Sequence, residues 1–330
     1  STATFNHTLS ADYALAITGN AVFGNGTSDT VTLSGSGKNL SVSGTTTINT
    51  DHITSSGTQT YNGAVSLGAD TTLTGTTVTF NGNISGAYGL AIVGDAVLGD
   101  ASSDSLVLSG TNKALSITGN TNVYSGTITT SGTQTYGDAT SDSITLFNTS
   151  VLTISTAAAN KDITFNGSLN GSALGRLLTI NAGTGAIAFN AAVGNLYPIS
   201  NTSMTGGLFS AASSFTIAGT LGITTSDTQT FSAAVSFGGA ASFTTSNDNI
   251  SFSSTLNSIS SAQSLSINVG TGTLQFAGAV GASQAVGATT ITAGTATFLD
   301  AFYSTGATAI TATNISTAAT KVFSVISSAN

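Results

Sequence analysis

The sequence predicts an all-β protein, and three observations lead to this prediction: few charged residues, abundant β-compatible residues and tandem repeats. Only 5% of the 330 residues are charged, and all 13 acidic residues are Asp. Glu, Lys and Arg normally fill exposed helix faces, so their scarcity beside abundant Thr, Val, Ser and Gly disfavours helices. With 40% hydrophobic residues the chain is too apolar for a disordered linker, and we expect it to fold.

Two tandem repeats divide the chain. Tyr13–Gly24 aligns with Tyr88–Gly99 without a gap, which defines a 75-residue repeat. Leu178–Gly185 aligns with Leu265–Gly272, which defines an 87-residue repeat. Units of this length fit either an immunoglobulin-like sandwich or several turns of a solenoid, so a finer period has to decide between them.

That finer period is present in both halves. Large apolar residues recur at nearly constant steps, which are shorter in the first half than in the second. A sandwich gives no reason for such spacing, whereas a solenoid stacks the same side of every coil and fills its core with one column of side chains. The expected columns are Phe5, Phe23, Val42, Tyr61, Phe80, Leu98, Ile117 and Tyr136, followed by Phe165, Phe189, Phe209, Phe231, Phe252, Phe276, Phe298 and Phe323.

Short strands and tight corners make up each expected coil. Triplets such as Leu40–Val42 and Leu265–Ile267 alternate apolar and polar residues, as half-buried strands do. Gly and Asn follow the triplets and are typical of corners with positive φ. Outward Thr and Ser avoid like-charge repulsion between coils about 4.8 Å apart. We therefore predict a parallel β-helix, or β-solenoid, of about 16 coils, each of roughly 19 and later roughly 22 residues.

The domain organisation follows from the two periods. We expect residues 1–136 to form a β-solenoid with the 75-residue repeat and residues 165–330 to continue it with the 87-residue repeat. Residues 137–164 are expected to form an irregular junction, because the step from Tyr136 to Phe165 is the longest in the columns.

The repeats resemble those of a known family. The stretches "SGTQTYNGAVSLGADTTLTGTTVTFNGNI" and "LTINAGTGAIAFNAAVG" are similar to the repeats of filamentous haemagglutinin-like adhesins. These are very large secreted bacterial surface proteins whose passenger regions are right-handed parallel β-helices. The resemblance spans about Thr4 to Gly294 and rests on structural repeats, not on active-site motifs. It implies a secreted, cell-surface location.

The leading functional hypothesis is a non-enzymatic extracellular rod or fibre of a bacterial surface adhesin, with a host or cell-surface glycan or protein as partner. One alternative is a filament or sheath subunit that associates end to end, because neither end of the sequence reads as a polar cap. Another alternative is a carbohydrate-binding β-helix. Its candidate residues are Tyr124, Tyr197 and Tyr303, which lie outside the main columns.

No catalytic or cofactor-binding residues are predicted, and we expect the protein not to be an enzyme. His7 and His52 are the only histidines, and the chain has no Cys, no Glu and no G-x-S-x-G motif. The segment Leu33–Lys38 fails as a phosphate-binding loop because Asn39 follows the Lys in place of Ser or Thr. Five basic residues are too few for nucleic acid, and no apolar run approaches the roughly 18 residues of a membrane helix.

No metal site is predicted either, although one acidic loop occurs three times. Paired Asp residues within a copy could offer oxygen ligands to calcium. A side-chain-capped turn is the favoured interpretation, because the first copy lacks the earlier Asp and no copy matches a known calcium loop. Calcium is kept only as an alternative. The three copies are Gly24–Asp29, Gly99–Asp104 and Gly137–Asp142.

Overall fold

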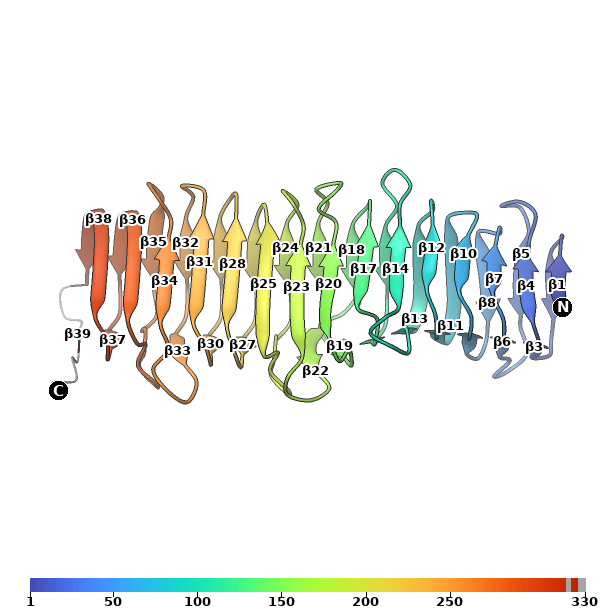
Figure 1. Ribbon diagram of the computed structural model, residues 1–330, viewed down its shortest axis with the longest axis horizontal. Coiled ribbons are helices and arrows are strands. Elements are labelled where there is room, and N and C mark those ends of the chain that lie inside the picture. The colour runs from blue at the N-terminus through green and yellow to red at the C-terminus, as the bar shows by residue number, and fades with distance from the viewer. Residues whose placement is uncertain (319–321, 326–330) are drawn as a thin grey trace. The chain divides into compact units, whose positions relative to one another are not determined.

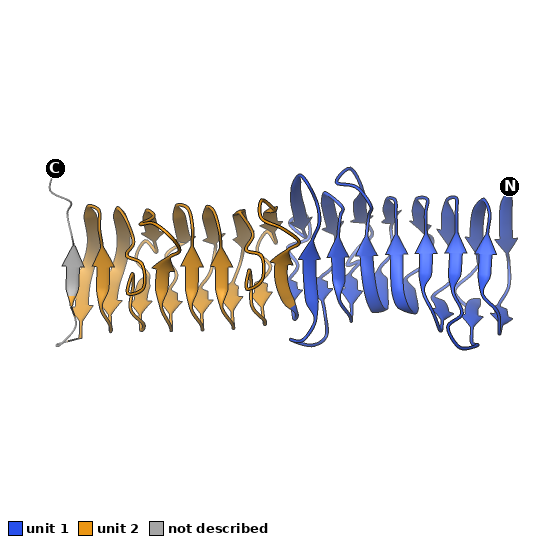
Figure 2. Cartoon of the chain, turned by 90° about the horizontal axis from the view of Figure 1, so that it is seen from below, with its two compact units in different colours: residues 1–167 blue, residues 168–330 orange. Residues whose placement is uncertain are grey.

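The computed structural model describes residues 1–318 and 322–325, and no helix occurs among them. The chain divides into two compact units, Ser1–Gly167 (unit 1) and Ser168–Asn330 (unit 2), coloured separately in Figure 2. The strands of each unit pair in parallel and stack turn on turn, which confirms the predicted β-solenoid. The described parts of the two units hold about 14 turns, fewer than the 16 expected.

Unit 1 consists of three parallel ladders, to each of which every complete turn contributes one strand (Figure 1). The first ladder comprises β1 (Thr2–Phe5), β4 (Asn20–Phe23), β7 (Thr46–Ile48), β10 (Val65–Leu67), β12 (Ile84–Gly86), β14 (Ser105–Leu108), β17 (Thr127–Thr130) and β20 (Val151–Ser155). The second comprises β2 (Leu9–Ala11), β5 (Thr30–Leu33), β8 (His52–Ser55), the first parts of β11 (Thr71–Phe80) and β13 (Leu90–Leu98), β15 (Leu115–Ile117), β18 (Gln134–Tyr136) and β21 (Ile163–Phe165). The third comprises β3 (Leu15–Ile17), β6 (Leu40–Val42), β9 (Gln59–Tyr61), the last parts of β11 and β13, β16 (Thr121–Val123) and β19 (Ser143–Leu146).

Unit 2 has the same three-ladder construction. Its first ladder comprises β23 (Leu177–Asn181), β25 (Asn201–Gly206), β28 (Leu221–Thr225), β31 (Ala241–Thr245), β34 (Leu265–Asn268) and the first parts of β36 (Thr289–Phe298) and β38 (Thr308–Thr317). The second comprises β24 (Ile187–Phe189), β26 (Phe209–Ala211), β29 (Gln229–Phe231), β32 (Ile250–Phe252), β35 (Thr273–Phe276) and the last parts of β36 and β38. The third comprises β22 (Ser168–Gly171), β27 (Phe215–Ile217), β30 (Val235–Phe237), β33 (Leu256–Ser258), β37 (Phe302–Ser304) and β39 (Phe323–Val325), linked by bridges at Val193 and Val280.

Two coils of unit 1 are longer than the expected column requires. Phe23 pairs with Ile48 and not with the expected Val42. Leu98 likewise pairs with Val123 and not with the expected Ile117. In both coils the additional residues form corner loops that leave the strand lengths unchanged. The expected column therefore passes from one ladder to another at these points, which accounts for part of the difference in turn number.

The expected junction, residues 137–164, contains regular strands. It holds β19, β20 and most of β21, which pair in parallel with β16, β17 and β18 respectively. Tyr136 pairs with Phe165, so the long step between them is a single coil whose extra residues lie in the loops between these strands. The division between the compact units comes after Gly167.

Aromatic rings stack from coil to coil in the core of each unit. Tyr61 lies on Phe80 with ring centroids 5.3 Å apart. In unit 2 the rings of Phe231, Phe252, Phe276 and Phe298 stack in succession, as the column predicts. Such pairs contribute about 0.5–1.5 kcal/mol beyond the area they bury. Two members depart from the expected column. Phe209 pairs with Gln229, and Phe323, whose side chain lies outside the described part of the chain, pairs with Phe302 in the third ladder.

Corner residues have a role that the sequence did not suggest. Among described residues other than glycine, positive φ occurs only at Asn112, Asn160 and Asn247. Most corner Asn side chains instead bond to the next coil. The Thr45 N–H donates to Asn20 Oδ1 at 3.0 Å, and the same pattern recurs at corners of both units. Corner Asn residues therefore join successive coils through their amide oxygens, in addition to the strand ladders.

The two repeats relate differently to the turn of the solenoid. β3 lies in the third ladder, but its copy in the 75-residue repeat, Leu90–Ile92 of β13, lies in the second ladder. The 75-residue repeat thus spans eleven strand positions, or three and two-thirds turns. β23 and its copy in the 87-residue repeat, β34, lie in the same ladder, with β25, β28 and β31 between them. The 87-residue repeat is therefore four whole turns.

A buried Gln begins the recurring Gln-Thr-Tyr motif. Gln59 is fully buried, and its Nε2 donates to the carbonyl oxygens of Ile53 and Thr74 at 3.0 and 2.8 Å. The Tyr61 hydroxyl donates to Gln59 Oε1 at 2.8 Å. Burial raises the pKa of the Tyr61 phenol far above its usual range, so the hydroxyl keeps its proton and serves as this donor. Gln134 and Tyr136 form the same pair, at 2.7 Å.

The third copy of this motif lacks the hydroxyl, and this predicts a stabilising substitution. Gln229 is fully buried, and its Oε1 has no hydrogen-bond partner among the described residues because Phe231 stands where the other copies have Tyr. We expect Phe231→Tyr to raise the free energy of unfolding by about 1 kcal/mol and Tyr136→Phe to lower it by about 1–3 kcal/mol. Chemical denaturation monitored by circular dichroism measures both changes.

The control for this prediction is Phe252→Tyr, which adds a hydroxyl in the same aromatic stack but follows Ile250, not Gln. Its hydroxyl would be buried without that acceptor, so we expect destabilisation. Equal effects of Phe231→Tyr and Phe252→Tyr would contradict the role assigned to Gln229.

Candidate functional site

The three acidic loops are capped turns in the structure. In the second copy the backbone N–H groups of Asp100 and Ala101 both donate to Asp104 Oδ2 at 3.0 Å. The third copy repeats this arrangement, with Asp142 accepting from Asp138 and Ala139. In the first copy Asp29 accepts from Asn25 at 3.0 Å. The last Asp of each copy thus satisfies the turn's own backbone donors, as the favoured interpretation predicts.

Both histidines lie on the exposed surface. His52 begins β8, and its Nδ1 lies 2.9 Å from Oδ1 of the neighbouring Asp51. His7 lies in the loop between β1 and β2 and is exposed. Within residues 1–318 and 322–325 no three His, Cys, Asp or Glu side chains are close enough together to hold a metal ion. Calcium binding by the acidic loops stays an alternative that a calcium titration would test.

The three tyrosines proposed for carbohydrate binding lie in different places. Tyr124 follows β16, and its ring stacks on Phe147 with centroids 4.7 Å apart. Tyr197 is exposed in a corner loop of unit 2. Tyr303 lies in the middle of β37 and is partly buried. Carbohydrate binding stays an alternative for each of them, to be tested on a glycan array with the corresponding Tyr→Ala variant.

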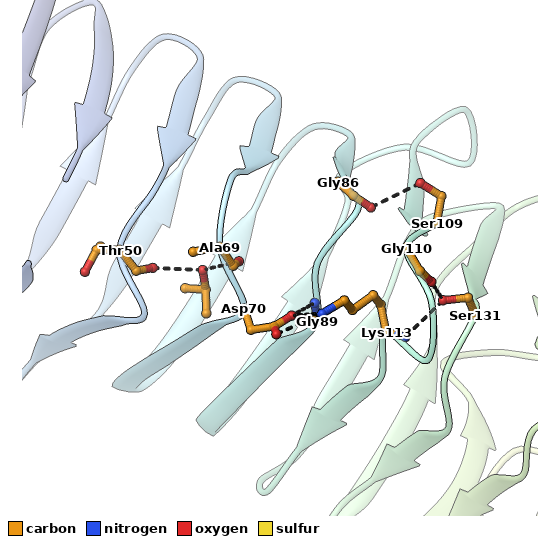
Figure 3. Close-up of polar contacts among 10 residues, drawn as sticks. Thr50, Ala69, Asp70, Gly86, Gly89, Ser109, Gly110, Lys113 and Ser131 are labelled. Carbon is orange, nitrogen blue, oxygen red and sulfur yellow. Dashed lines mark hydrogen bonds and ion pairs between the residues drawn. The ribbon is translucent and has the colours of Figure 1, made fainter. Parts of the chain in front are cut away.

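Lys113 is the centre of a polar cluster in unit 1 (Figure 3). Its Nζ donates to both carboxylate oxygens of Asp70, at 2.8 and 2.9 Å, and lies 5.6 Å from the centre of the Tyr88 ring. The Gly89 N–H also donates to Asp70 Oδ1, at 2.7 Å. Asp70, Gly89 and Lys113 precede β11, β13 and β15, so the cluster joins three successive turns. Sequence analysis did not identify this cluster.

These contacts also fix the charge state of Asp70. The hydrogen bond from Gly89, followed by the hydrogen bond and charge of Lys113, lowers the pKa of the Asp70 carboxyl below its ordinary value. A recess of about 300 Å³ lies alongside, and the paired residues Thr72, Ala91 and Ser116 are among those that line it. Because the carboxylate and the ammonium bind each other, this cluster links successive coils.

Lys38, the counterpart of Lys113 in the 75-residue repeat, has no such cluster. It forms no ion pair within the part of the chain that the structure describes, and Tyr13, the counterpart of Tyr88, is largely exposed. Comparing the two copies in the sequence could reveal that Lys113 and Tyr88 recur, but Asp70 comes from an earlier coil and has no fixed spacing to them that a motif search would detect.

No family model, curated protein or solved structure matches this chain significantly. Among the described residues there is also no helix long and apolar enough to cross a membrane. The similarity to haemagglutinin-like repeats therefore stays a prediction from the sequence. What the chain itself offers is two β-solenoid units whose polar clusters join coils to one another.

Proposed function

We propose that this chain is a non-enzymatic structural element, an extracellular shaft of a bacterial surface adhesin. The observation that supports this most is the uninterrupted parallel ladder within each unit, in which every turn is hydrogen-bonded to the next over a filled core. A load along such a stack is shared by many backbone hydrogen bonds and by stacked aromatic rings, which gives a stiff spacer.

The surface chemistry supports the same proposal. Outward positions are mostly Thr, Ser and Ala, and the few charged groups cap turns or link coils, as Asp104 and Lys113 do. A spacer needs a surface that keeps coils from repelling each other, and small polar residues provide it. A host glycan or protein is the proposed target of the complete adhesin.

Surface labelling would test this proposal. Antibodies raised against the purified chain should label intact source cells before permeabilisation, and the chain should survive protease concentrations that degrade its heat-unfolded form. Permeabilised cells and a cytosolic marker are the controls. Labelling only after permeabilisation would overturn the extracellular location, and rapid cleavage throughout both units would overturn the role as a rigid shaft.

A second candidate function is a subunit that assembles end to end, and an open strand edge favours it. β38 pairs with β36 and with no other strand among the described residues, and its Ile315 is 55% exposed. An unpaired edge of ten residues is a template for another strand. Electron microscopy of the purified chain at rising concentration would detect fibres. Ala312→Pro should prevent them, because Pro removes a backbone donor from the open edge.

A further inference from the structure

Unit 2 contains two copies of one corner, because its repeat is four whole turns. Asn170 Oδ1 accepts the Leu196 N–H at 3.0 Å, and in the second copy Asn257 Oδ1 accepts the Ser283 N–H at 3.1 Å. The same side-chain bond therefore anchors both corners to the following coil. The loop that holds Leu196 and Tyr197 has the same backbone course in both copies, with Gly194 and Gly281 at φ +70° and +72°. The loop that holds Leu174 differs, because Gly175 has a φ of +94° and its counterpart Ala262 has no positive φ.

The first corner exposes large apolar side chains that the second lacks. Leu174, Leu196 and Tyr197 are 70%, 73% and 52% exposed. Polar residues occupy the equivalent positions of the second corner: Ser261, Ser283 and Gln284. Ile259, 42% exposed, is the one large apolar residue of the second corner, where the first has Ser172. Since the matching loop of the second corner carries polar residues, apolar side chains at positions 196 and 197 are not required for its backbone course, and exposed large apolar residues indicate a contact surface.

Arg176 adds a charge to this surface. It is the only arginine of the chain, and Gln263 takes its place in the second corner. Its Nε and Nη2 donate to Ser172 Oγ at 3.2 and 3.0 Å, which holds the guanidinium group beside the loop. Leu174, Arg176, Leu196 and Tyr197 are called the corner patch below. Tyr and Arg are among the residues most enriched at the energetic centres of protein interfaces.

Unit 1 has a recess with an apolar wall and an acidic residue at its rim, which complement the apolar and positive side chains of the corner patch. Its volume is about 220 Å³, and the stacked rings of Tyr124 and Phe147 form its apolar wall. The Thr149 N–H donates to Ser102 Oγ at 2.8 Å, which ties together two loops of different coils beside the rings. Asp100 lies exposed at the rim, and its carboxylate has no hydrogen-bond partner in the described ranges. These residues are called the aromatic recess below.

We propose that the corner patch of one copy of this chain docks into the aromatic recess of a second copy. Leu174 or Leu196 would fill the recess against the two rings, and Arg176 would pair with Asp100 of the second copy. The net charge of −8 makes a positive group rare and an acidic partner site abundant on the same chain. A patch-to-patch contact is disfavoured, because it would bring two Arg176 side chains together.

This contact is heterologous, since one surface meets a different surface on the other copy. It goes beyond the proposed shaft function, because it would join shafts side by side. It is also separate from the strand edge of β38, which concerns backbone pairing. Failure of the contact would therefore leave both proposals of the preceding section untouched.

Charge reversal provides the test, by sedimentation velocity of the full chain over a concentration series. We expect concentration-dependent association of the unmodified chain, and at least about tenfold weaker association for Arg176→Asp and for Asp100→Arg, because each brings like charges together. A mixture of the two variants should associate again, since every mixed contact pairs opposite charges. The double variant in one chain should do the same.

A loop exchange is the matched control for folding. The triple variant Leu174→Ser, Leu196→Ser and Tyr197→Gln copies the second corner onto the first, so its melting temperature should equal that of the unmodified chain while association is lost. Monomers at every concentration, unchanged association of Arg176→Asp, or no recovery in the mixture would each overturn the proposal. Binding of the monomeric chain to neutral phosphatidylcholine vesicles through Leu174 and Leu196 would also overturn it, by assigning the patch to lipid.

Discussion

Phe252→Asp should unfold the coils around β32 of unit 2. Phe252 is 1% exposed, and its ring lies against those of Phe231, Phe243 and Phe276 at centroid distances of 4.7, 5.2 and 5.3 Å. A carboxylate there would lose these contacts and its own hydration. We expect a loss of about 5 kcal/mol or more in the free energy of unfolding, seen as a lower or absent thermal transition by circular dichroism.

The neighbouring residue gives the control for this prediction. Ser251 points away from the core of the same strand, in register with Thr230 and Gln275. Ser251→Asp should change stability by no more than about 0.5–1 kcal/mol, as surface substitutions usually do. Phe80→Asp, in the stack with Tyr61, applies the same test to unit 1. Unchanged melting temperatures of both Phe variants would show that the assigned columns are not the core.

Gly94→Ala should destabilise unit 1 almost as strongly. Gly94 lies within β13, next to the register shift against β11, and has a φ of +129°, which residues with a side chain rarely adopt. A Cβ added there would lie 1.9 Å from the Gly75 carbonyl oxygen of the preceding coil. Neither backbone can move without breaking the ladder between β11 and β13. We expect a loss of about 3 kcal/mol or more, measured by chemical denaturation.

Gly26→Ala is the matched control, because Gly26 has no positive φ and an added Cβ there would meet no atom within 4 Å. It should be neutral or slightly stabilising, since Ala has less freedom than Gly in the unfolded chain. If Gly94→Ala and Gly26→Ala had the same stability, the close approach of the coils at Gly94 would be refuted.

The sequence predicts the solenoid because its core residues are large and regularly spaced. Tyr61, Phe80, Phe252 and Phe276 occupy the expected interior positions, since one inward aromatic residue per coil is visible as a period. The length of each coil is harder to predict from the sequence, because corner loops of unequal size add residues without adding strands. A fixed step therefore fails at Phe23, whose true partner is Ile48.

The period of large apolar residues does not reveal polar residues in the interior. Gln59 and Gln134 look like surface residues of a Thr-rich strand, yet both are fully buried and satisfied by backbone carbonyls and a Tyr hydroxyl. The hydrogen-bond partners of these Gln side chains become known only from the three-dimensional structure. The recurrence of Gln-Thr-Tyr was a signal, since a motif that recurs with its Gln unchanged suggests that the Gln is needed.

The candidate contact surfaces were even less predictable. Tyr124 and Tyr197 were noted because they lie outside the columns, but the recess depends on Ser102 and Thr149, which only the stacking of coils brings together. Leu174 and Leu196 were not singled out in the sequence. Their significance comes from the second corner, which carries Ser at both equivalent positions.

The unequal phase of the two repeats has a consequence for how such a chain could change length. Gain or loss of one 87-residue segment within unit 2 would insert or remove four whole turns. Every later side chain of the unit would then point in the same direction around the solenoid axis as before. Gain or loss of one 75-residue segment within unit 1 would shift each later strand to a neighbouring ladder. The corner loops and outward side chains of those later coils would then be rotated by a third of a turn around the solenoid axis. The three acidic loops already point in three directions: they follow β4, β13 and β18, which belong to the first, third and second ladders. Duplication in unit 1 therefore redistributes loops around the axis, whereas duplication in unit 2 lines them up along one side.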